Sequence, residues 1–104
     1  MAGITLDKFI SELKNHAELY EIQIAIKHIA VFNVCTIKNY RFEEGEDFLM
    51  ISSEDSRTNF QLYVNEILEI KDIFTADEIP WRVAAFTISC ENEMEIGINL
   101  LLNK

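Results

Sequence analysis

Two cysteines and two histidines are the residues of this chain that could pair a nucleophile with a base: Cys35, Cys90, His16 and His28. A catalytic thiol needs a base within hydrogen-bond reach and a nearby cation or helix N-terminus. Both cysteines instead fall within apolar segments typical of buried strands. We therefore expect two buried free thiols and no catalytic pair.

Metal ligands and phosphate-binding glycines are not arranged in a recognisable motif. No Cys-x-x-Cys or His-x-x-x-His spacing occurs, and the acidic run around Gly45 lacks the ligand spacing of an EF-hand. Gly3, Gly45 and Gly97 are too far apart to surround a phosphate. The acidic residues fall in turn-like segments, which disfavours a pair of catalytic carboxylates. We expect a protein that is not an enzyme and that has no metal and no cofactor.

Charge is distributed unevenly along the 104 residues. Residues 1–42 contain four acidic and five basic residues, whereas residues 43–104 contain fourteen acidic and four basic ones, and the net charge is −9. Such an acidic field repels phosphate backbones, so direct nucleic-acid binding is disfavoured. The same field attracts and steers a protein partner with a basic surface. Charge that only keeps the protein soluble is the plainer interpretation.

Six of the acidic residues lie in two predicted loops, residues 39–47 and 52–59. We predict a partner-binding surface there, with one exposed aromatic residue as an anchor. In a simple up-and-down meander these two loops fall at opposite ends of the strand between them, so one continuous patch is not guaranteed. The predicted residues are Glu43, Glu44, Glu46, Asp47, Glu54, Asp55 and Tyr63.

The centre of the chain predicts a hairpin. Residues 47–52 contain a continuous apolar run, and Phe60, Leu62 and Val64 alternate with polar residues at the period of a strand. The polar residues between them are typical of a turn. Residues 66–70 are ambiguous between a helical turn and a strand. We favour a continuing or bent strand, over residues 60–70.

The N-terminal third predicts a helix and then a long extended segment. Thr5 can cap a helix, and the apolar residues that follow repeat at helical spacing, which predicts a helix over residues 5–18 whose apolar face packs on a sheet. Residues 21–38 are rich in β-branched residues. We predict a strand there, with a bend or bulge near Lys27 and His28 that lets one segment run through two strands of a curved sheet.

The C-terminal third predicts a short helical turn and a hairpin. Thr75 and Glu78 have the spacing of a capping box, and Trp81 is expected to fill the core. Alternation of apolar residues predicts strands over residues 82–90 and 94–102. Gly97 inside the second strand suggests a bulge or a close backbone approach.

These elements define a single α+β domain over residues 1–104. An N-terminal helix is expected to pack on a five- or six-stranded, mostly antiparallel curved sheet or small barrel. No apolar run is long enough to span a membrane, and acidic residues interrupt the N-terminal segment where an export signal would need an apolar core, so we expect a cytoplasmic protein.

Three functions are compatible with this pattern. The first is a small acidic inhibitor or immunity-type protein that blocks a basic, nucleic-acid-handling partner. It rests on an analogy of size and charge to anti-CRISPR proteins and nuclease inhibitors. The second is a subunit of a homo-oligomer or larger assembly that uses a sheet edge, for which residues 94–102 are suited. The third is a small-ligand binder at the mouth of a barrel.

Overall fold

The structure is a computed structural model that describes residues 2–16, 20–28, 31–55, 57–74 and 81–102. These residues form one helix, nine strands and a short 3-10 helix, and every strand pairing is antiparallel. The predicted α+β class is confirmed. In chain order the elements are β1 (Ala2–Gly3), α1 (Leu6–His16), β2 (Tyr20–His28), β3 (Val31–Ile37), β4 (Arg41–Glu44), β5 (Phe48–Ser52), β6 (Asn59–Tyr63), η1 (Val64–Glu66), β7 (Ile67–Asp72), β8 (Arg82–Cys90) and β9 (Met94–Leu102).

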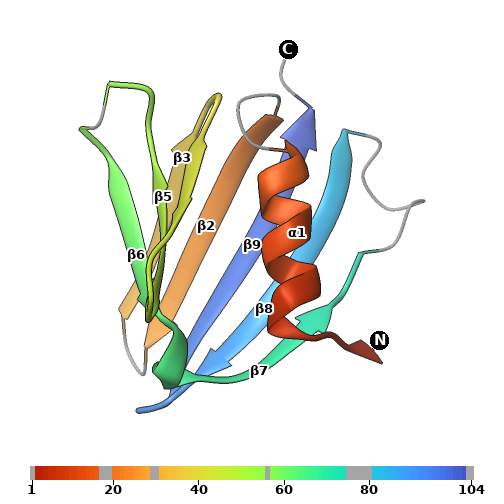
Figure 1. Cartoon of the computed structure of the whole chain (residues 1–104), viewed down its shortest axis with the longest axis vertical. Helices are drawn as coiled ribbons and strands as arrows, with labels where there is room; N and C mark the ends of the chain where they lie inside the picture. The colour runs from red at the N-terminus through yellow and green to blue at the C-terminus, as the bar shows by residue number, and fades with distance from the viewer. Residues whose placement is uncertain (1, 17–19, 29–30, 56, 75–80, 103–104) are drawn as a thin grey trace.

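The strands form two sheets rather than one. The larger sheet has the order β1-β7-β8-β9-β2-β3, and the smaller has the order β4-β5-β6. Figure 1 shows α1 in front of the larger sheet, over β8 and β9, with the smaller sheet beside it in front of β2 and β3. The outer described strands β1 and β3 do not pair with each other. The larger sheet is therefore open, and the small barrel, which was one of the two predicted forms, is not closed.

The helix begins where the sequence predicts. The backbone N–H of Lys8 donates to Oγ1 of Thr5 at 3.2 Å, which is the N-cap hydrogen bond. Phe9, Ile10 and Leu13 lie on the buried face, and the ring of Phe9 meets that of Phe86 on β8 edge to face, with centroids 5.1 Å apart. Because this face packs on the larger sheet, the prediction of a core-packed helix is confirmed.

The core is one cluster that joins the helix to both sheets. The strand registers align rows of isoleucines on the inner face of the larger sheet, for example Ile26, Ile96 and Ile88. Fully burying a side chain such as Ile88 or Ile96 stabilises the fold by about 1.5–3 kcal/mol, and the partly buried Ile26 contributes less. From the smaller sheet, Leu49, Ile51 and Leu62 join the same cluster.

Residues 21–38 do not form one bent strand. They contain the two antiparallel strands β2 and β3, whose register pairs His28 with Val31, so the chain reverses between these residues. Only Ile29 and Ala30 lie between them, and they are not among the described residues. Since neither is a typical turn residue, the sequence carries no turn signal at this point.

Residues 60–70 are also divided. β6 ends at Tyr63, η1 follows, and β7 begins at Ile67 in the other sheet. The N–H of Val64 donates to the carbonyl oxygen of Asp47 at 2.8 Å, which extends the β5–β6 register by one pair, and the chain leaves this sheet within η1. The predicted bend exists, but it moves the chain between sheets.

The predicted C-terminal hairpin is confirmed in strands β8 and β9. Its inner face, which includes Phe86, Ile88 and Ile98, is almost fully buried. The expectation of a bulge or close approach at Gly97 is wrong: the β2 and β8 registers run through it without a shift, and an added Cβ would only touch Ala25 at 3.8 Å. β9 lies between β8 and β2, so residues 94–102 offer no free edge for strand addition.

Three local expectations have different outcomes. Trp81 is 47% exposed and does not fill the core. The predicted helical turn at Thr75 and Glu78 lies outside the described residues. Cys90 is buried and Cys35 half-buried, and both are free thiols.

Candidate functional site

The predicted acidic residues lie on the smaller sheet and its connections. Residues 39–47 are not a simple turn, because Glu43 and Glu44 belong to β4. Glu46 and Asp47 occupy the β4–β5 connection, Glu54 and Asp55 the β5–β6 loop, and Tyr63 the end of β6. All seven predicted residues, including Tyr63 at 44% exposure, are exposed.

The seven residues do not form one patch: Glu43 and Glu44 lie along β4, opposite Met50 and Leu49 of β5, and the other five lie at the two ends of the smaller sheet. Phe48 pairs with Tyr63, so Glu46, Asp47 and Tyr63 lie at one end of the smaller sheet. Glu54 and Asp55 follow the other end of β5, a five-residue strand about 16 Å long. The acidic loops therefore lie at opposite ends, as an up-and-down meander predicts.

Two of the predicted residues have local structural contacts. The ammonium of Lys14 on α1 lies 3.3 Å from Oε1 of Glu44, with both side chains largely exposed. An exposed ion pair of this kind contributes about 0–1 kcal/mol. It ties β4 to the helix, so Glu44 is only partly available to a partner.

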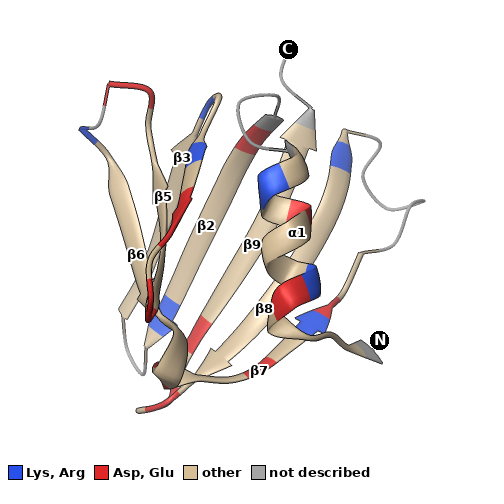
Figure 2. Cartoon of the chain, viewed as in Figure 1, with Lys and Arg blue, Asp and Glu red and all other residues tan. Residues whose placement is uncertain are grey.

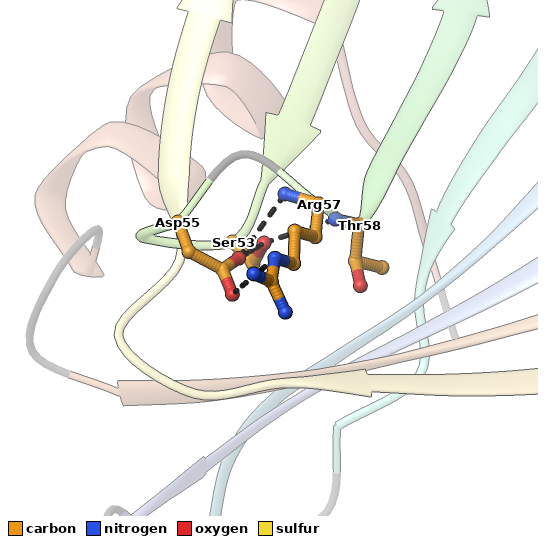
Figure 3. Close-up of polar contacts among 4 residues, drawn as sticks. All are labelled: Ser53, Asp55, Arg57 and Thr58. Carbon is orange, nitrogen blue, oxygen red and sulfur yellow. Dashed lines mark hydrogen bonds and ion pairs between the residues drawn. The ribbon is translucent and has the colours of Figure 1, made fainter.

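Asp55 organises its own loop (Figure 3). Its carboxylate accepts a hydrogen bond from the hydroxyl of Ser53 at 2.6 Å and from the N–H of Arg57 at 3.1 Å. The Ser53 hydroxyl in turn accepts from the N–H of Thr58 at 3.0 Å. The Ser53 hydrogen bond, followed by the Arg57 N–H, lowers the pKa of Asp55. We therefore assign Asp55 a role in holding the loop closed.

Backbone hydrogen bonds gather other carboxylates at the end of the molecule that contains Asp47. The Asp47 carbonyl accepts from Val64 in η1, and the Glu66 carbonyl, also in η1, accepts from the N–H of Glu91 at 3.0 Å. Three connections, β4–β5, η1 and β8–β9, thus meet here, and Figure 2 shows acidic segments at this lower end of the view. We call Glu46, Asp47, Glu66, Glu91 and Glu93 the acidic end.

Sequence reasoning missed three members of the acidic end: Glu66, Glu91 and Glu93. The strand directions could have indicated that these residues lie together, because two antiparallel strands in succession return the chain to the end where it started. Using these directions required knowing that η1 separates β6 from β7. That break became visible only in the structure, where β6 and β7 belong to different sheets.

Three further observations bear on the metal, thiol and ligand chemistries considered from the sequence. No group of three or more His, Cys, Asp or Glu side chains in the described part of the chain could hold a metal ion. Burial, and next the charge of Glu66, raises the pKa of the Cys90 thiol, which is the opposite of activation. An open depression is lined by Lys38 and by Ser53, Glu54 and Asp55 of the β5–β6 loop.

Comparisons with known proteins yield no relative. No family model matches the chain, and neither the curated proteins nor the solved structures include a significant match. Across the residues that the structure covers, no helix has the length and apolar character needed to cross a membrane.

Proposed function

We propose that this protein binds a protein partner with a basic surface and blocks it, as an inhibitor or immunity-type protein acting on a nucleic-acid-handling protein. The observation that supports the proposal is the acidic end, where two backbone hydrogen bonds bring together three connections that carry five acidic residues. The occupied surface on the partner would be one that otherwise contacts phosphates.

Electrostatics favours this mode of binding. The net charge of −9 accelerates the approach of a basic partner, and short connections whose backbone is already hydrogen-bonded need little reordering on contact. Tyr63 precedes η1 directly and is exposed beside the acidic end. A rigid aromatic side chain next to a charged surface suits the anchor of an interface.

The test begins with capture of partners from a host lysate on the immobilised chain, followed by mass spectrometry. Two charge-matched variants are compared with the native chain. One carries Glu46→Lys and Glu91→Lys at the acidic end, and the other carries Glu21→Lys and Glu54→Lys at the opposite end of the strands. Each Glu→Lys change adds two positive charges, so both variants have a net charge of −5.

Association rates between the captured partner and each form of the chain are then measured at low and high salt. The acidic-end variant should associate about tenfold more slowly at low salt and show a flatter salt dependence, whereas the control variant should stay close to the native chain. Tyr63→Ala should mainly speed dissociation. Equal slowing by both variants would mean that only the net charge matters and not the position of the acidic residues, which would contradict the proposed surface. An acidic-end variant that associates as fast as the native chain would overturn the proposal.

A further inference from the structure

Strand β3 is an open edge of the larger sheet. Among the described strands it pairs only with β2. Three of its apolar side chains are largely exposed: Val31 at 55%, Phe32 at 64% and Val34 at 52%. The backbone groups and the apolar side chains of one seven-residue strand are therefore both accessible.

Proteins usually protect such an edge with charges, proline or an irregularity, and β3 has none of these. Its sequence, VFNVCTI, has no charged residue and no proline, and its register with β2 is continuous. The opposite side of the sheet is different. β1 has two residues, and the neighbouring stretch of β7 has a register shift between Ile67 and Glu69.

We propose that β3 pairs with β3 of a second copy of this chain, antiparallel and about a twofold axis, so that the two larger sheets become one continuous sheet. This inference rests on the edge of β3 and not on the proposed function. The sequence predicted such contacts for residues 94–102, but that strand lies in the centre of the larger sheet, whereas β3 lies at its edge.

Backbone geometry sets which residues would bond across the axis. Only two residues separate the paired His28 and Val31, and the pair that flanks such a short connection is hydrogen-bonded. Alternate residues of β3 then turn their N–H and C=O groups away from β2: Phe32, Val34 and Thr36.

The side chains favour one register. With the axis at Asn33, Phe32 lies opposite Val34 of the second copy, and Val31 lies opposite Cys35 of the second copy. Each pair occurs twice because of the symmetry, and no like charges meet. Apolar and aromatic pairs directly across an antiparallel ladder contribute roughly 0.2–1 kcal/mol each.

The charge distribution favours a second copy in this orientation. β3 begins at the same end of the larger sheet as the acidic end, because Val31 pairs with His28 and His28 with Met94, the residue after Glu93. The exposed Lys27, which lies beside Phe32, pairs on its other side with Glu95. β3 is followed by the exposed Lys38, which lies in the turn, and by the exposed Arg41 at the start of β4. Antiparallel pairing therefore brings Lys38 and Arg41 of each copy to the same end of the joined sheet as the acidic end of the other copy.

The contact is small, which sets the expected affinity. A seven-residue strand is about 23 Å long. One strand pair with a few apolar contacts buries less than the area of a stable obligate interface. We expect a reversible dimer with a Kd on the order of 10–100 µM.

Sedimentation velocity from about 1 to 500 µM tests the proposal across this Kd range. The native chain should shift from monomer to dimer. Val34→Lys and Phe32→Lys should weaken the dimer at least tenfold, because each places two like charges beside the axis. Leu68→Lys is the matched control, since Leu68 is an apolar residue 66% exposed on β7, away from β3. Circular dichroism checks that each variant folds.

A cross-link tests the register. In a chain that carries Cys35→Ser, Asn33→Cys would face its own symmetry mate in a non-hydrogen-bonded pair, with Cα atoms about 4.5 Å apart, within disulfide range. Mild oxidation should yield a disulfide dimer with Asn33→Cys and much less with Leu68→Cys. The proposal fails if the native chain is monomeric throughout, or if dimerisation survives both lysine substitutions on β3. It also fails if Asn33→Cys cross-links no better than Leu68→Cys.

Discussion

The hydroxyl of Tyr40 offers a sharp test of how the helix is held against the smaller sheet. Tyr40 is fully buried just before β4, and its hydroxyl donates to the carbonyl oxygen of Leu13 at 2.7 Å. Leu13 lies in the last turn of α1, where carbonyl groups lack partners within the helix. Tyr40→Phe keeps the ring and removes only this hydrogen bond.

The expected cost follows from the burial of both partners. A neutral hydrogen bond contributes about 0.5–1.5 kcal/mol net, and a buried carbonyl left without its donor costs about 1–3 kcal/mol. We expect Tyr40→Phe to lower the free energy of unfolding by about 1–2 kcal/mol, as measured by urea denaturation at neutral pH. Tyr63→Phe, at an exposed tyrosine, is the matched control and should change it much less.

The same residue predicts a dependence on alkaline pH. Burial, and next the charge of Glu12, raises the pKa of Tyr40 well above its ordinary value. The contribution of Tyr40 to the free energy of unfolding is therefore fully present below the unfolded-state pKa of about 10. Above that pH, the unfolded chain releases the tyrosine proton while the folded chain retains it, so stability falls by up to about 1.4 kcal/mol per pH unit.

Tyr40→Phe should remove this part of the alkaline slope, so the stability curves of the native chain and the variant should converge above about pH 10. The reasoning would be refuted by a variant that matches the native chain at neutral pH. It would also be refuted by parallel curves through the alkaline range.

Two further substitutions test backbone and packing details. Glu93 has a φ of 61°, in the left-handed region that is costly for a residue with a Cβ, so Glu93→Gly should raise the free energy of unfolding by about 0.5–1 kcal/mol. Glu91→Gly removes the same charge without a positive φ, and an equal gain there would contradict the explanation. Gly45→Ala should cost about 1–3 kcal/mol, because its Cβ would collide with the ring of Phe48. Phe48→Leu in the same chain should recover part of that loss, and simple additivity in a thermal or urea double-mutant cycle would exclude the collision.

Several features of the fold follow from local sequence patterns. The helical face of α1, its Thr5 cap and the alternation in β8 and β9 each depend on residues close together in the chain, and all are found where predicted. The need for glycine at position 45 comes instead from a tertiary contact: its φ is not positive, and the close ring of Phe48 leaves no room for a Cβ.

Only part of the candidate site could be predicted from the sequence. Glu46, Asp47 and Tyr63 were predicted together, and strand pairing keeps them together. Glu54 and Asp55 were predicted with them but lie at the far end of β5, and Asp55 serves its own loop. Glu66, Glu91 and Glu93 joined the acidic end only through hydrogen bonds between residues distant in the chain.

The sequence alone determined the α+β class, the acidic character and the strands with a clear period, because periodicity and charge are local properties. Only the tertiary structure decided that residues 21–38 reverse direction, that η1 moves the chain between two sheets and that β3 rather than β9 is the open edge. Strand order depends on which apolar faces bury one another, and many arrangements satisfy the same alternation. The choice among them is made by packing of the whole core, which no single segment encodes.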